Sequence, residues 1–185
     1  MRMILLTCCV VLFGSLQTAH AYHRVTSIRT PAETPPTADD WLSTLGMALG
    51  PTLATAIRQG RDHAYPHGQA IPASIRQRLA PFFPRALLQK VRYSTEWQDA
   101  TAESALYSLL LGTGAEAVTL GDVIIFRDAQ RAADPLLWAH ELTHVEQYER
   151  LGMATFARQY LQQGWVLEQE AIANASKIQR QLAPE

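Results

Sequence analysis

The residues of this sequence best suited to chemistry are two histidines and a glutamate in the segment HELTH at residues 140–144. Helical positions four residues apart differ by about 40° around the axis, so the imidazoles of His140 and His144 can bind one metal ion. Glu141 lies about 60° from His144, beside such a metal, where its carboxylate can take a proton from a metal-bound water. The pattern predicts a zinc site in which His140 and His144 are ligands and Glu141 is the catalytic base.

A well-marked helix is expected to carry this segment. Asp134 can cap its N-terminus, Pro135 suits its first position, and Gly152 stands where it should end. The alternative is a helix with two histidines and no metal. Because Leu137 and Tyr148 share the face of the histidines, both imidazoles would be buried, and buried imidazoles are costly without a shared partner. The metal site is therefore favoured.

A catalytic zinc has three protein ligands and one exchangeable water, so a third ligand is required. Arg150 stands six residues after His144, where one large class of zinc peptidases has a third histidine, and this excludes that class. The remaining candidates are Glu168 and Glu170, in a helix expected from Trp165 to about Leu182.

Helical geometry favours Glu170 over Glu168 as the third ligand. Glu170 lies at the centre of an apolar stripe, whereas Glu168 points about 160° away from it. A carboxylate in a buried stripe needs a partner, and a metal ion is a sufficient one. Asn174, one turn after Glu170, is then expected to hydrogen-bond a zinc-ligating histidine. The stripe consists of Val166, Leu167, Ala171, Ala173, Asn174 and Ile178.

The group that stabilises the oxyanion during hydrolysis is less clearly marked. Tyr148 follows His144 by one turn, and Tyr160 lies in the next expected helix. His63 and His67 lie in an expected loop. Tyr148 and Tyr160 are the candidate transition-state stabilisers, and a structural role is the alternative for all four side chains.

The elements expected around the site form an α+β domain that is mostly helical with a small sheet. Two apolar, β-prone runs at 117–120 and 123–126 flank Gly121-Asp122, a pattern typical of a two-residue hairpin turn. An edge strand there could hold an extended peptide. Helices are expected at 41–49, 51–59, 74–80, 99–111, 155–163 and 165–182, a loop at 62–68 and a β-prone run at 91–93.

The composition is that of one globular domain. The 185 residues carry a net charge of −1, which gives no electrostatic case for binding nucleic acid or an anionic membrane surface. A basic start, an apolar centre and an Ala-x-Ala exit predict a signal peptide over residues 1–21, which contains both cysteines. A flexible, Pro-rich leader is expected over 22–40 and a single domain over 41–185. The protein is therefore expected to be exported, periplasmic or secreted, with no membrane anchor after cleavage; a retained N-terminal anchor is the alternative.

A helix bearing HExxH, followed by a glutamate ligand from a downstream helix, resembles the gluzincin branch of zinc peptidases. The segments TLGDVIIF, LWAHELTHVEQY and EQEA more closely resemble the metallopeptidase-like domain of bacterial toxins and secreted effectors catalogued as domain-of-unknown-function family 4157. The resemblance covers about Ile71 to Ala175. It implies a zincin-like fold with an edge strand beside the cleft, one Zn²⁺ per chain bound by His140, His144 and Glu170, and Glu141 as the catalytic residue.

The function expected from these features is that of an exported zinc metallopeptidase, in which a zinc-activated water hydrolyses peptide bonds of a peptide or protein substrate. A non-enzymatic zinc-binding interaction or scaffold module of a secreted or toxin-associated system is the first alternative. The second is a small protein without a metal. An intact Glu141 favours the enzyme, because a structural zinc site needs no proton acceptor beside it.

Overall fold

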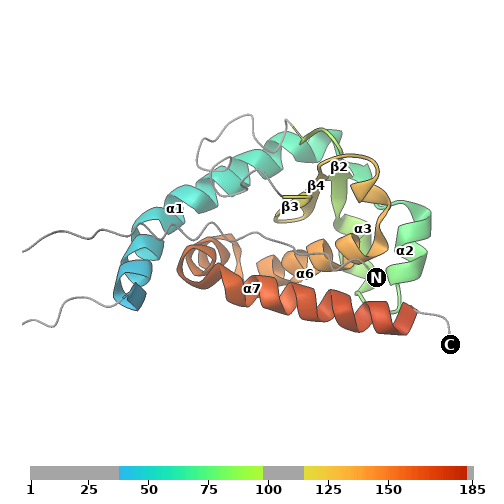
Figure 1. The fold of residues 1–185 in the computed structure, drawn as a ribbon. Helices are drawn as coiled ribbons and strands as arrows, with labels where there is room; N and C mark the ends of the chain where they lie inside the picture. Colours follow the sequence, from blue (N-terminus) through green and yellow to red (C-terminus); the bar gives the residue numbers. More distant parts are fainter. Residues whose placement is uncertain (1–37, 98–114, 183–185) are drawn as a thin grey trace, which may run out of the picture.

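The computed structural model describes residues 38–97 and 115–182 (Figure 1). These residues form an α+β fold that is mostly helical with one small sheet, as predicted. No helix in these two ranges is both long and apolar enough to cross a membrane. The helices are α1 (Ala38–Ala64), α2 (Ala73–Leu79), α3 (Arg85–Lys90), α6 (Pro135–Leu151) and α7 (Met153–Leu182), with 3₁₀ turns at Tyr65–His67 and Arg131–Ala133; the strands are β1 (Gln69–Ala70), β2 (Arg92–Ser94), β3 (Ala117–Leu120) and β4 (Val123–Phe126).

Several expectations fall on other parts of the chain. The predicted signal peptide and the predicted helix at 99–111 lie outside the described residues. The predicted leader at 22–40 does so except for its last three residues, which already belong to α1.

The sheet has the strand order β1-β2-β4-β3, with β2 and β4 parallel and the other two pairs antiparallel. The hairpin predicted for 117–126 is confirmed: β3 and β4 pair in register from Leu120 opposite Val123. Gly121 opens the turn with φ of 66°, a conformation that glycine adopts without strain. The hairpin leaves β3 at the edge of the described sheet.

Strand β4 connects the two hydrophobic cores. All four of its residues are buried, and successive side chains of a strand point to opposite faces. Ile124 and Phe126 pack in a core with side chains of α2, α3 and α6, whereas Val123 and Ile125 pack in a core with α1 and α7. Figure 1 shows α1 above β3 and β4 and α6 below them.

Helix α6 carries the HELTH segment and has the ends that the sequence predicts. The Asp134 carboxylate accepts a hydrogen bond from the backbone N–H of Leu136 at 2.8 Å, Pro135 follows in the first turn, and Gly152 ends the helix with φ of 73°. The helix is buried along most of its length. Its position between the sheet and α7 places the motif inside the protein.

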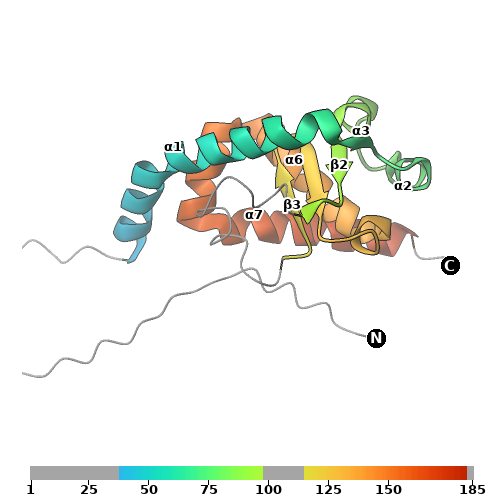
Figure 2. The same ribbon diagram turned by 90° about the horizontal axis from the view of Figure 1, so that it is seen from above.

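The prediction of two helices separated at Gly50-Pro51 is wrong, because α1 continues through this pair. A proline removes one helical hydrogen bond and bends a helix, and the α1 ribbon is bent in its first half (Figure 1). The helix persists because it packs along α7, as the view from above shows (Figure 2). The predicted loop at 62–68 is likewise replaced in part, since α1 extends to Ala64 and a 3₁₀ turn follows.

Helix α7 consists of two straight parts, as the sequence predicts. Gln163 has φ of −154° and ψ of 46°, which is not helical, and it separates the part that begins at Met153 from the part that ends at Leu182. The two parts run in different directions in Figure 1. The second part lies along α6 and brings its glutamates to the motif.

Glycines allow α1 and α7 to approach closely, and this yields a test of the packing. A Cβ on Gly46 would overlap the side chain of Gln162 and lie 3.0 Å from the carbonyl oxygen of Arg158. We expect Gly46→Ala to lower the free energy of unfolding by about 1–3 kcal/mol, measured by urea denaturation. Gly164→Ala is the matched control, because its Cβ would meet only the Tyr160 ring at an ordinary 3.6 Å. Equal stability of both variants would contradict the close packing.

Candidate metal centre

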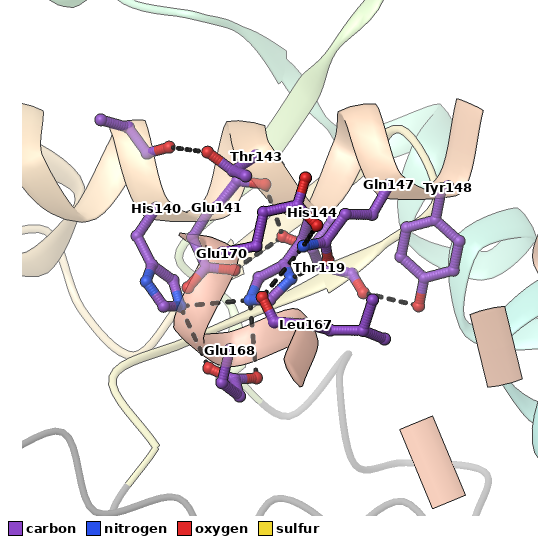
Figure 3. A network of polar contacts seen from close by, with 11 residues as sticks. Thr119, His140, Glu141, Thr143, His144, Gln147, Tyr148, Leu167, Glu168 and Glu170 are labelled. Carbon is purple, nitrogen blue, oxygen red and sulfur yellow. Dashed lines mark hydrogen bonds and ion pairs between the residues drawn. The ribbon is translucent and has the colours of Figure 1, made fainter. Parts of the chain in front are cut away.

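Three side chains from two helices converge on one point inside the protein. The Nε2 atoms of His140 and His144 are 3.1 Å apart. The Glu168 carboxylate lies 3.4 Å from Nε2 of His140 and 3.5 Å from Nε2 of His144 (Figure 3). Both histidines are buried, and the Glu168 side chain is 19% exposed. These three residues form a group close enough to hold a metal ion.

The spacing of the two imidazole nitrogens fits a tetrahedral zinc site, and Glu168 lies within reach of both. Ligand atoms about 2.0–2.1 Å from a zinc ion, at tetrahedral angles, lie about 3.3 Å from each other. The two Nε2 atoms lie 3.1 Å apart, close to that value, and the two oxygens of Glu168 are divided between the histidines, with Oε2 3.4 Å from His140 and Oε1 3.5 Å from His144. Two imidazole nitrogens and one carboxylate oxygen are also a donor set that zinc prefers.

The structure brings Glu168, and not the preferred candidate Glu170, to the two histidines. Both oxygens of Glu170 accept hydrogen bonds from the Arg150 guanidinium at 2.8 Å, and its side chain is 39% exposed. The helical wheel placed Glu170 at the centre of the buried stripe, but the observed stripe has a different centre. The buried positions in this part of α7 are Leu167, Ala171 and Ile178, whereas Val166 and Ala173 are exposed. The two glutamates therefore flank the stripe on opposite sides, and only Glu168 faces the histidines.

The electrostatics of the site favour a positive charge between these side chains. Burial by itself would lower the pKa of His144, but hydrogen bonding to Glu168 and the nearby charge of Glu141 raise it to about 9. Burial would raise the pKa of Glu168, but contact with both histidines lowers it to about 2. The carboxylates of Glu141, which is buried, and of Glu168, which is partly exposed, thus favour a positive charge on His144. A divalent metal ion would meet the same need.

Gln147 orients the imidazole of His144, and the sequence did not predict this contact. Its side-chain N–H₂ group donates to the carbonyl oxygen of Leu167 at 2.9 Å and to Glu170 at 3.1 Å. Its carbonyl oxygen, 2.8 Å from Nδ1 of His144, must therefore accept a hydrogen bond from that nitrogen. With the proton on Nδ1, the lone pair of Nε2 is available to a metal.

The prediction that Asn174 would hydrogen-bond a ligating histidine is wrong, because its amide donates to the Thr143 hydroxyl at 2.9 Å. Thr143 in turn donates to the backbone carbonyl of Ala139 within α6. The sequence signal that could have identified Gln147 is its spacing, because it follows His144 by three residues on the same helix. In the structure it is a fully buried polar side chain, which needs a hydrogen-bond partner.

Removing the Gln147 amide should weaken metal binding. We expect Gln147→Met to lower zinc affinity about 10- to 100-fold, because Nδ1 of His144 loses the acceptor that fixes its tautomer. Competition with a chromogenic chelator measures the change. Asn174→Leu, which removes an amide that does not contact a histidine, should change the affinity by less than about threefold. A reversed order would reassign the orienting role.

Glu141 is held by the edge strand of the sheet. The Thr119 hydroxyl of β3 donates to the Glu141 carboxylate at 2.6 Å, and both side chains are buried. The Tyr148 hydroxyl donates to the backbone carbonyl of Thr119 at 3.3 Å, which joins α6 to the same strand. Figure 3 shows Glu141 on the same helix and between the two histidines. Strand β3 therefore positions Glu141. This carboxylate belongs to the motif but not to the group formed by His140, His144 and Glu168.

Of the other candidate residues, the two tyrosines pack in the core and the two histidines are exposed. The Tyr148 ring stacks on Phe156 with centroids 3.8 Å apart, and the Tyr160 ring stacks on the same phenylalanine at 5.9 Å. His63 and His67 lie near the end of α1 with their ring centroids 6.4 Å apart. The role of Tyr148 and Tyr160 in stabilising a transition state stays a prediction.

Comparison with known proteins gives one match. No curated protein and no solved structure matches the chain. A family model matches residues 70–152, from β1 to the end of α6, and this segment contains Thr119 and the HELTH motif but not Glu168. It overlaps the segment for which we expected a metallopeptidase-like family, yet its description names an injection-system domain and not a peptidase. Residues 70–152 are thus similar to the eCIS core domain, the core domain of extracellular contractile injection systems.

Proposed function

We propose that this chain is an exported zinc-binding protein of a secreted, toxin-associated system, with one Zn²⁺ bound by His140, His144 and Glu168. The convergence of two Nε2 atoms and one carboxylate within 4.8 Å carries this proposal. The similarity of residues 70–152 to the eCIS core domain supports the association with an extracellular system.

Metal analysis of the purified protein tests the zinc site. We expect about one equivalent of zinc per chain after gentle purification, and a lower melting temperature after chelation, because an ion bound only to the folded state stabilises it. The double variant His140→Ala/His144→Ala should retain no zinc. Less than about half an equivalent of zinc per chain in the wild-type protein would contradict the proposal.

The family match favours a first use of the metal, as the centre of a non-enzymatic interaction module. In such a module zinc would fix the second part of α7 against α6, because the ligands come from both helices. The predicted partner is then another component of the secreted system. This candidate accounts for a match whose description names no catalytic activity.

The position of Glu141 favours a second use, hydrolysis of a peptide bond. A zinc bound by three protein ligands would polarise a carbonyl and lower the pKa of a coordinated water toward about 7. Glu141, buried and oriented by Thr119, would take the proton from the attacking water and pass it to the leaving amine. His140, His144 and Glu168 would hold the metal throughout.

Incubation with peptides separates the two candidates. Zinc-loaded protein is mixed with a broad peptide library and with periplasmic extract, and new termini are mapped by mass spectrometry. New termini that a chelator abolishes support hydrolysis. Their absence from a protein that carries a full equivalent of zinc supports the interaction module.

A further inference from the structure

Positive charge is concentrated in one segment of the chain. Between Asp62 and Glu96 the sequence has five lysines and arginines and no aspartate or glutamate, although the whole chain has a net charge of −1. This segment folds as β1, α2, α3 and β2, and most of it lies within the part that matches the eCIS core domain. The five cations therefore belong to elements that follow one another in the chain.

A groove of about 500 Å³ lies between α2 and α3 in this segment. Its polar lining comes from Arg76 and Gln77 of α2 and from Arg85 and Gln89 of α3. Its apolar lining includes Leu88 and two alanines. The lining positions recur every three or four residues in each helix, so one face of each helix forms one wall.

The two arginines of the groove are available to a partner. Arg76 and Arg85 are exposed, and no acidic side chain within residues 38–97 and 115–182 forms an ion pair with either. Two of the other three cations of the segment differ in this respect, whereas Arg78 is also exposed and forms no ion pair with a described residue. Lys90 pairs with Glu149, and the Arg92 guanidinium donates to backbone carbonyls at the end of α3.

We propose that the groove between α2 and α3 binds an acidic peptide segment of a partner protein. Its carboxylates would pair with the guanidinium groups of Arg76 and Arg85, which match carboxylates in a two-pronged geometry. An aliphatic side chain between them would cover Leu88 and the alanines. A single-stranded nucleic acid is the less suitable occupant, because its bases need aromatic rings for stacking and the lining contains none.

This site shares no residue with the metal centre, so it goes beyond the proposed function and can be tested separately. The probe is a labelled peptide of alternating glutamate and leucine with blocked ends. We expect the probe to shift backbone amide resonances of α2 and α3 in the zinc-loaded protein. Arg76→Glu/Arg85→Glu should lower its affinity at least about tenfold, because two attractive contacts become repulsive.

A charge-matched control identifies the site. Arg58→Glu/Arg180→Glu makes the same change in net charge at exposed positions of α1 and α7, and should leave the affinity within about twofold. Circular dichroism checks that both variants are folded. An absence of amide shifts in α2 and α3, an equal loss of affinity in the control, or tighter binding of a short oligothymidylate than of the peptide would each overturn the proposal.

Discussion

Glu168→Ala is expected to lower the zinc affinity of the protein by about a hundredfold or more, whereas Glu170→Ala should lower it by less than about tenfold. The Glu168 carboxylate lies 3.4 and 3.5 Å from the two histidine nitrogens, so its loss would remove the proposed third ligand. Glu170 contacts Arg150 and the Gln147 amide, so its loss affects the metal only through Gln147. Titration against a chromogenic chelator of known affinity measures both variants.

The two glutamates provide their own control. Both lie in the second part of α7, two residues apart, and each substitution removes one negative charge and shortens the side chain equally. A non-specific effect of charge or helix stability would therefore weaken zinc binding by a similar factor in both variants. The contrary outcome, in which Glu170→Ala loses zinc and Glu168→Ala keeps it, would restore the assignment made from the helical wheel.

The elements that could be predicted are those whose signals are local. Asp134, Pro135 and Gly152 mark the ends of α6 because capping and proline at the first turn depend on neighbouring backbone groups. Gly121-Asp122 marks the hairpin turn for the same reason. The two histidines of the motif meet because four residues of helix bring them together in any fold.

The features that could not be predicted depend on contacts between distant segments. The choice of Glu168 over Glu170 is made by the side of α7 that faces α6, and two glutamates flanking a short apolar stripe leave that side undecided. Helix α1 passes through Gly50-Pro51 because it packs on α7, which outweighs the local signal to stop. The hydrogen bond from Thr119 to Glu141 spans 22 residues and needs the sheet to be in place.

The largest effect on reaction rate is expected from Glu141→Gln. If the protein hydrolyses peptides, this variant should lose about 10²- to 10⁴-fold in kcat, because glutamine cannot accept the proton of the attacking water. Zinc should still bind, with a smaller loss of affinity than in Glu168→Ala, since Glu141 contributes a nearby charge but is not one of the three grouped residues. The measurement is the rate of appearance of new termini from a peptide that the wild-type protein cleaves, at a fixed zinc content.

Two controls, the melting temperature of Glu141→Gln and the rate of Glu146→Gln, show whether the loss of rate is specific to the Glu141 carboxylate. The glutamine can keep the hydrogen bond from Thr119, because its carbonyl oxygen can accept where the carboxylate oxygen did, so the variant should unfold at nearly the wild-type temperature. Glu146→Gln, on the same helix and outside the grouped ligands, should keep the wild-type rate. A Glu141→Gln protein that binds zinc and cleaves at the wild-type rate would show that another group is the base. A wild-type protein that binds zinc and cleaves nothing would instead leave Glu141 as a buried partner of Thr119 in a zinc-binding module, and the variant would then still bind zinc.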